Sequence, residues 1–281
     1  MKTGKEEIMR LVFLLAACAS IALVAMICVF LFGNGLPTIG KIGVTEFFLG
    51  ETWRPNNDLY GILPMILGSA YVTLGAIVVG VPIGILTAVF MARFCPDRFL
   101  KPAVELLAGI PSVVYGFFGL VVMVPFIRDN IGGTGSSMLT ASLLLAMMIL
   151  PTLISVAEAA LRAVPNSYYE GALALGAGHV RSVFFTIVPA AKSGIMAAII
   201  LGLGRAVGET MAVIMVAGNQ ARMPQGLLEG VRTMTTNIVI EMGYAADMHR
   251  DALIATAVVL FIFILIINLT FSYLKGKVVQ Q

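Results

Sequence analysis

Two ionisable residues stand inside an otherwise apolar stretch of the chain. Arg205 and Glu209 lie four residues apart in the run 201–213, a spacing that places both on one face of a helix. A charged side chain at the centre of a bilayer costs about 2.5–3.5 kcal/mol on insertion scales. Two interpretations follow. Either the residues form an internal ion pair that stabilises the helices, or Arg205 meets an anionic substrate, for which its planar guanidinium is suited, and Glu209 holds it in place.

A second apolar stretch, residues 107–117, contains Gly109, Pro111 and Ser112. Irregular backbone inside a membrane is tolerated where it lines a cavity or packs on protein. Freed amide groups and the Ser112 hydroxyl could bind an anion, as broken helices do in transporters. The alternative is a simple proline kink. The candidate substrate path therefore consists of Arg205, Glu209 and Ser112.

A third segment, residues 162–192, is polar enough to lie outside the membrane and yet has helical features. Ser167 and Glu170 have the spacing of a capping box, which predicts a helix start, and Gly176 can end that helix. A second helical stretch runs to Pro189. A short helix with apolar side chains either docks in a groove on a partner or lies on the membrane surface.

The elements that position these residues follow from composition. The chain is 59% hydrophobic and only 12% charged, against about 25% charge in a typical soluble domain. We therefore expect one all-α integral membrane domain over residues 1–281. Six apolar runs approach the roughly 20 residues that a helix needs to cross a bilayer: residues 11–32, 62–92, 103–127, 138–161, 193–217 and 252–274.

The distribution of basic residues predicts the orientation. Eleven lysines and arginines fall in one set of connecting segments and six in the alternate set. The first set, which contains both termini and the segment 162–192, is expected to be cytoplasmic. Two cytoplasmic termini require an even number of spans, which agrees with six.

Enzyme motifs are lacking in the sequence. It contains no P-loop, no metal-ligand cluster and no nucleophile elbow. His179 and His249 fall in predicted loops and are interpreted as solvated side chains. We expect no catalytic residue, no metal, no cofactor bound by this chain and no nucleic-acid partner; any ATP must be hydrolysed by another subunit.

The segment 162–192 resembles the EAA loop of ABC importer permeases. The resemblance rests on Glu170-Gly171-Ala172, on Gly176 six residues after the glutamate, and on Pro189 nineteen residues after it. Gly171, Thr186 and Val188 depart from the family's Ala, Ile and Leu. In that family the loop docks into a cleft on the ATPase subunit. The resemblance implies that Glu170, Gly171, Ala172, Gly176 and Pro189 couple this chain to an ATPase.

The stretches 108–116 and 204–213 together resemble the phosphate-specific transport (Pst) permeases of bacteria and archaea, and the ending Glu-Thr-Met-Ala-Val resembles the PstC type more than the PstA type. The resemblance implies a type I ABC importer permease fold in a prokaryotic inner membrane, inorganic phosphate as the substrate, and alternating access. It also implies the partners: a PstA-type permease, a pair of PstB-type ATPases that use ATP, and a PstS-type phosphate-binding protein.

Three alternatives remain open on the residues alone. The chain could be an ABC permease for another oxyanion, such as sulfate or molybdate. It could be a proton-coupled anion carrier, with Glu209 as the proton carrier and no need for Glu170. It could also be a regulatory or sensing membrane scaffold.

Overall fold

The computed structural model describes residues 4–95 and 100–279, and these are almost entirely helical. The α-helices are α1 (Gly4–Ile42), α2 (Val44–Leu49), α3 (Leu63–Val89), α4 (Leu100–Ala108), α5 (Ser112–Phe118), α6 (Val124–Asn130), α7 (Met138–Arg162), α8 (Asn166–Ala174), α9 (His179–Ser182), α10 (Val188–Ala190), α11 (Lys192–Gly208), α12 (Met211–Val216), α13 (Met234–Met242) and α14 (Asp247–Val279). One small antiparallel ribbon joins β1 (Trp53–Arg54) to β2 (Leu59–Tyr60).

The predicted number of membrane spans agrees with the structure. Five helices of the described chain are long and apolar enough to cross a bilayer, namely Glu6–Ile42, Leu63–Phe94, Ser112–Asn130, Met138–Arg162 and Asp247–Thr270. A sixth is reached if the segments His179–Ala190 and Lys192–Gly208, which meet at a bend of 69°, are counted as one span. The fifth predicted span, 193–217, is not continuous because the helix breaks after Gly208.

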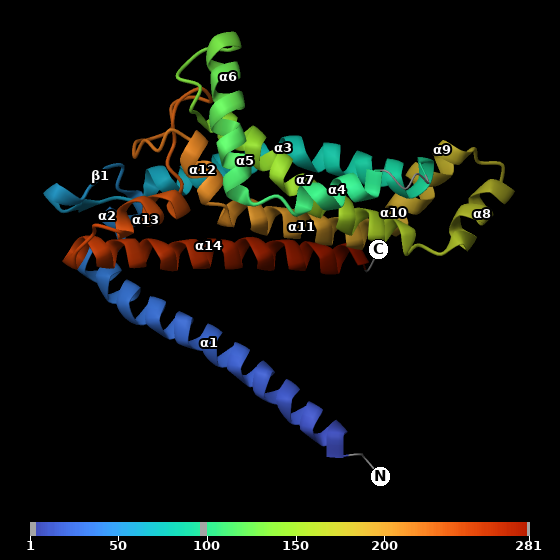
Figure 1. The fold of residues 1–281 in the computed structure, drawn as a ribbon, viewed down its shortest axis with the longest axis horizontal. Coiled ribbons are helices and arrows are strands. Elements are labelled where there is room, and N and C mark those ends of the chain that lie inside the picture. Colours follow the sequence, from blue (N-terminus) through green and yellow to red (C-terminus); the bar gives the residue numbers. More distant parts are fainter. Residues whose placement is uncertain (1–3, 96–99, 280–281) are drawn as a thin grey trace.

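Figure 1 shows how these helices are arranged. Helices α3, α7, α11 and α14 run side by side, with α8 and α9 at one end of the bundle and α2, α13 and the β-ribbon at the other. We call these the α8 end and the α13 end. Helix α1 touches α14 near the α13 end, where Phe32 packs edge-on against Phe261 with ring centroids 5.7 Å apart, and then diverges. Both described termini point toward the α8 end, as an even number of spans requires; their cytoplasmic location stays a prediction.

The centre of the bundle is the contact between α3 and α7. Two glycines of α3 allow it, because a Cβ on Gly80 would lie 2.9 Å from Ile149 and one on Gly84 would lie 3.0 Å from Leu153. Such small residues let two helix backbones approach closely in a membrane, where the hydrophobic effect does not drive helices together. Helix α11 also packs on α7, through Gly202, which faces Leu153.

The third predicted span, 103–127, is wrong at its start. Residues 100–108 form the separate helix α4, which packs beside α7, and the chain turns at Gly109–Pro111 before α5 begins at Ser112. Figure 1 shows α5 and α6 leaving the direction of α3 and α7. A proline fixes its own φ and lacks an N–H, and it disfavours helical backbone in the residue before it. The interruption is therefore a true break between two helices and not a simple kink.

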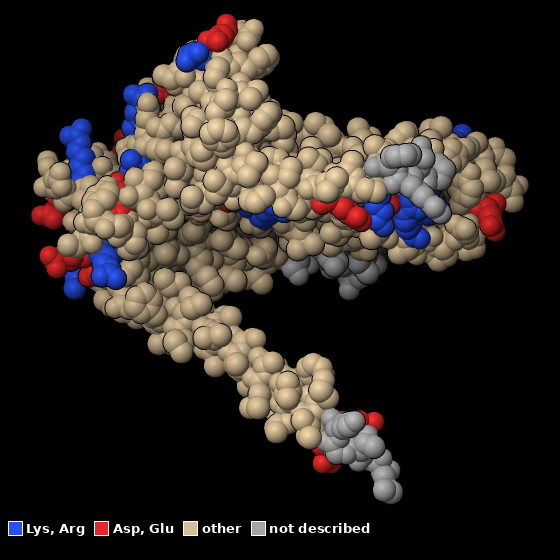
Figure 2. All heavy atoms as spheres, viewed as in Figure 1, with Lys and Arg blue, Asp and Glu red and all other residues tan. Residues whose placement is uncertain are grey.

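The surface matches a protein surrounded by lipid. In Figure 2 the acidic and basic side chains gather at the two ends, at the tip of α6 and near the start of α1, and few lie along the middle of the bundle. Between α1 and α3, three aromatic side chains, Phe47, Trp53 and Tyr60, are almost fully buried. The aromatic residues of this segment therefore hold a structured unit together. Burial, followed by the nearby Asp58 carboxylate, raises the pKa of the Tyr60 phenol.

Candidate functional site

The span that carries Arg205 is broken at Glu209. Helix α11 ends at Gly208, Glu209 has extended backbone with φ −70° and ψ 132°, and α12 starts two residues later at Met211. The prediction that Arg205 and Glu209 share one helix face is therefore wrong, because the helical period stops between them. Among the described residues, neither Glu209 nor any other carboxylate lies within ion-pair distance of Arg205.

Glu209 instead caps the helix that follows it. Its Oε1 accepts hydrogen bonds from the backbone N–H of Thr210 at 3.2 Å and from that of Ala212 at 3.3 Å. The first N–H groups of a helix have no partner within the helix, and a carboxylate there is favoured by the helix dipole. The negative charge of Glu209 is thus directed at the start of α12 and leaves Arg205 without an acidic partner.

Arg205 is held by a hydroxyl. Its Nη1 donates to Thr152 Oγ1 at 3.2 Å, and Thr152 lies near the middle of α7. Within the described chain this is the one hydrogen bond that the guanidinium makes, and the side chain is half-buried. Arg205 is also close enough to Tyr115 of α5 for an electrostatic interaction. A positive charge at mid-span therefore keeps most of its donors available.

Ser112 lies at the same level of the bundle on a neighbouring helix. It is the first residue of α5, directly after the N-cap residue Pro111. Helix α5 packs in parallel against α12, because Gly116 faces Ala212 and Gly119 faces Val216. The two chain breaks, at Gly109–Pro111 and at Glu209–Thr210, therefore lie next to each other. No hydrogen bond joins Ser112 to Arg205 or Glu209 in the described structure.

Four of the five predicted coupling residues lie on or just after α8, and the fifth, Pro189, lies in α10. Glu170, Gly171 and Gly176 are exposed, Ala172 is half-buried, and Pro189 is exposed in α10. No residue of α8 is buried, and Leu175, which follows it, is 91% exposed. A helix that leaves most of its apolar side chains uncovered by its own chain presents a surface for a partner.

Gly176 ends α8 in the way the sequence predicts. It has φ +85°, and two backbone hydrogen bonds close the helix: Gly176 N–H donates to Leu173 and Ala177 N–H donates to Ala172. This pair of bonds is the Schellman motif, which places its glycine in the left-handed region. The predicted capping box is wrong. The helix begins at Asn166 after the N-cap residue Pro165, without a side-chain cap, so Ser167 is already inside it.

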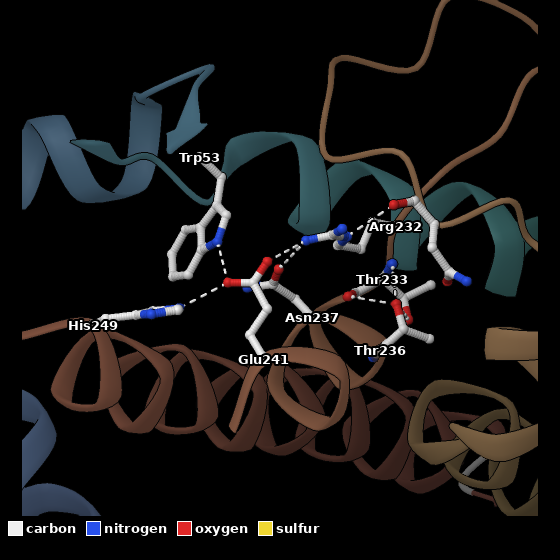
Figure 3. A network of polar contacts seen from close by, with 8 residues as sticks. Trp53, Arg232, Thr233, Thr236, Asn237, Glu241 and His249 are labelled. Atoms are coloured by element: carbon white, nitrogen blue, oxygen red, sulfur yellow. Dashed lines mark hydrogen bonds and ion pairs between the residues drawn. The ribbon is translucent and has the colours of Figure 1, made fainter. Parts of the chain in front are cut away.

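A buried polar cluster at the α13 end was missed from the sequence. Figure 3 shows the Glu241 carboxylate at its centre. Its Oε2 accepts from Trp53 Nε1 at 2.7 Å and lies 2.8 Å from His249 Nε2, and its Oε1 accepts from Arg232 Nη1 at 2.6 Å. Arg232 also donates to Asn237 Oδ1 at 3.1 Å. We call these five residues the Glu241 cluster.

The cluster corrects the interpretation of His249, whose side chain is only 15% exposed. His179 is exposed, as predicted, and its Nδ1 lies 2.7 Å from the Tyr169 hydroxyl. Four members of the Glu241 cluster lie between residues 232 and 249, but Trp53 is 188 residues from Glu241, so no local spacing could reveal the complete cluster. A signal in the sequence is the number of polar and charged residues between 219 and 250, among them Arg232, Asn237, Glu241 and His249.

Sequence comparisons relate most of the chain to membrane components of transporters. A family model described as "Binding-protein-dependent transport system inner membrane component" matches residues 80–280. The "Probable ABC transporter permease protein YqgH" of Bacillus subtilis is 38% identical over 94% of this chain and 89% of its own length. Proteins named "Phosphate transport system permease protein PstC" are 31% identical in Mesorhizobium japonicum, over 94% and 88% of the two chains, and 32% identical in Haemophilus influenzae, over 93% and 90%.

Solved structures with a similar fold come from ABC transporters. A chain of a bacterial alginate ABC transporter, crystallised with a periplasmic protein that binds an alginate pentasaccharide, superposes with a TM-score of 0.66 at 15% identity over 97% of both chains. A chain of the MetNI methionine ABC transporter, in an inward-facing conformation, gives a TM-score of 0.60 at 20% identity over 81% of this chain and 99% of that one. At these identities the likeness concerns the fold alone.

Proposed function

The chain belongs to the family of binding-protein-dependent transport system inner membrane components, and from this premise we propose that it carries inorganic phosphate. It is a multi-pass inner-membrane permease subunit of an ABC transporter, with the predicted type I importer fold, and it is not an enzyme. Such a permease works with a separate ATPase and an external binding protein. Phosphate as the substrate is supported by the PstC relatives and by the chemistry of the site.

The observation that carries the proposal is the unpaired charge of Arg205. Its Nη1 is bound to Thr152, and no carboxylate of the described chain neutralises it. An unpaired charge in the membrane interior is costly, so an anion that arrives there is stabilised. The Nε and Nη2 donors remain for a bidentate contact with an oxyanion. The guanidinium of Arg205 thus serves as a transient binding site for phosphate on its way through the membrane.

Release requires that the anion is not held too firmly. Ser112 at the start of α5 and the Glu209 carboxylate at the start of α12 lie at the same level of the bundle. A hydroxyl can donate a hydrogen bond to a phosphate oxygen or accept one from a protonated phosphate, whereas a carboxylate repels the anion. We propose that Arg205 attracts phosphate, Ser112 lines its path, and the charge of Glu209 limits how long it stays.

The energy for transport comes from outside this chain. We propose that the PstB-type ATPases bind the exposed α8 surface and that Glu170, Gly171, Ala172, Gly176 and Pro189 form or support this contact. The chain itself binds no nucleotide or other cofactor in this proposal. ATP binding would draw the two α8 regions of a heterodimer with a PstA-type permease together, and a PstS-type protein would deliver phosphate at the α13 end.

Competition for uptake tests the substrate. Cells that lack their own phosphate permease pair would receive this chain with its partner subunits, and uptake of radiolabelled phosphate would be measured against excess sulfate, molybdate or unlabelled phosphate. We expect only unlabelled phosphate to compete. Arg205→Ala should abolish uptake, whereas Arg128→Ala, which removes an exposed arginine paired with Asp129, should leave it unchanged. Competition by sulfate or molybdate would reassign the substrate.

A further inference from the structure

The segment between Arg232 and Thr236 is wedged between α3 and the break at Glu209. A Cβ on Gly68 of α3 would lie 2.4 Å from the Arg232 carbonyl oxygen, and the Met234 N–H donates to Ser69 Oγ at 2.9 Å. On the other side, the Thr235 hydroxyl donates to the Glu209 carbonyl at 3.1 Å. One short segment therefore contacts both a central span and the interrupted one.

The hydrogen bond from Thr235 satisfies a backbone carbonyl that the break leaves without a helical partner. A carbonyl at the end of a helix has no partner in a following turn, and Glu209 is the C-cap residue that follows the last residue of α11. Within the described chain, the Thr235 hydroxyl is the one donor to the Glu209 carbonyl. The Glu209 carboxylate thus accepts hydrogen bonds at the start of α12, and the Glu209 carbonyl accepts one from Thr235. These contacts fix the backbone of Glu209 from both sides.

Thr235 is itself rigidly placed. It lies in the first turn of α13, which Thr233 and Thr236 start with a capping box, and all three threonines are buried. The far side of α13 ends in the Glu241 cluster, where Trp53, Arg232 and His249 converge on one carboxylate. Figure 3 shows that the cluster and the capping threonines form one group of polar contacts around α13.

We propose that Thr235 is a positioning residue for the Glu209 break, and that the Glu241 cluster holds Thr235 in place from the α13 end. The inference rests on the proposed function, because it assigns the break to the phosphate path. Loss of the Thr235 hydroxyl frees the Glu209 carbonyl and lets the break relax. The positions of Glu209 and Arg205 relative to each other then change. We expect this to alter both the solvent accessibility of the break and the KM or kcat of phosphate uptake.

The experiment compares three threonine variants in the complete transporter, reconstituted in proteoliposomes. Thr235→Val removes the hydroxyl at nearly constant volume, and Thr235→Ser retains it. Thr256→Val is the matched control, because Thr256 is also buried but bonds only to Ala252 within α14. KM and kcat for ATP-driven phosphate uptake are measured for each. One neutral hydrogen bond corresponds to about a fivefold effect.

A second readout does not involve phosphate. Cys18, Cys28 and Cys95 are replaced by alanine, and Gly208→Cys places one thiol beside the break, where a Cβ meets no atom within 4 Å. The rate at which a water-soluble maleimide labels this thiol reports the state of the break. We expect Thr235→Val to change this rate, and KM or kcat, by about fivefold, while Thr235→Ser and Thr256→Val stay within twofold of the parent. Trp53→Phe, which removes one donor to Glu241, should shift labelling in the same direction.

The outcomes separate the two proposals. A parent transporter that carries no phosphate refutes the proposed function, whereas labelling still tests the positioning role. Equal behaviour of Thr235→Val and Thr256→Val would overturn the inference, as would a Thr235→Ser variant that fails as badly as Thr235→Val. Should Thr235→Val not assemble, unchanged labelling in Trp53→Phe would overturn it.

Discussion

Gly176→Ala should weaken the docking of α8 on the ATPase. Gly176 has φ +85°, and a Cβ there would meet no atom within 4 Å. The substitution therefore adds no clash and costs only the left-handed conformation, which for a residue with a Cβ is about 1–2 kcal/mol. A cost of 1.4 kcal/mol is a factor of ten in an equilibrium constant. If only the capped form of α8 docks, the apparent affinity for the ATPase falls by up to about thirtyfold.

The assay is a titration of the purified ATPase against the permease pair in nanodiscs, followed by fluorescence anisotropy, with ATP-driven uptake measured in parallel. Gly178→Ala is a matched control, since Gly178 is equally open but has φ −72°. Gly176→Asn gives a graded test, because asparagine adopts the left-handed region more readily than alanine.

The expected order of affinity is parent and Gly178→Ala first, then Gly176→Asn, then Gly176→Ala. Equal affinity of Gly176→Ala and Gly178→Ala would refute the reasoning, because the backbone conformation at residue 176 would then have no part in docking. A loss in both variants would show that the ATPase needs the bare glycine surface at both positions.

Three further outcomes are expected. Thr152→Val should raise the KM for phosphate uptake by about tenfold, since it removes a hydrogen bond to a charged group that orients Arg205; an unchanged KM would mean that the guanidinium is held by other contacts. Glu241→Gln should lower the melting temperature of the purified transporter, because Arg232, only 15% exposed, loses its buried counter-charge at a cost of about 3–5 kcal/mol; an unchanged melting temperature in a thermal shift assay would contradict this. Gly84→Val should reduce the yield of assembled complex in size-exclusion chromatography, because its Cβ alone would already lie 3.0 Å from Leu153; a normal yield would show that α3 and α7 can separate.

The spans could be predicted from the sequence because each is a long apolar run, and the length of hydrocarbon to be crossed is fixed. The ends of the spans were harder to predict. Helix α1 continues to Ile42 through Pro37, since its last turns pack on α14. A hydropathy window cannot register this contact. The same averaging merged α4 with α5, although Gly109 and Pro111 marked the place where they separate.

Part of the local geometry around the candidate residues could be predicted. Gly176 ends α8 as its residue type suggests, whereas the predicted placement of Arg205 and Glu209 on one helix face was wrong, and the roles of Arg205 and Ser112 stay predictions. An unbroken helix was assumed, and a break needs no proline when a carboxylate can cap the helix that follows, as Glu209 does. The Glu241 cluster could not be predicted, because Trp53 and Glu241 are 188 residues apart and only the tertiary fold brings them together.

The most direct test of the central claim is phosphate flux into proteoliposomes that contain this chain with its partner permease, ATPase and binding protein. Uptake of radiolabelled phosphate would be measured with and without internal ATP, and with and without a proton gradient. We expect flux that requires ATP, is indifferent to the gradient, and disappears in Arg205→Ala but not in Arg128→Ala. Flux that follows the proton gradient without ATP, or that persists in Arg205→Ala, would contradict an ATP-driven phosphate permease built around Arg205.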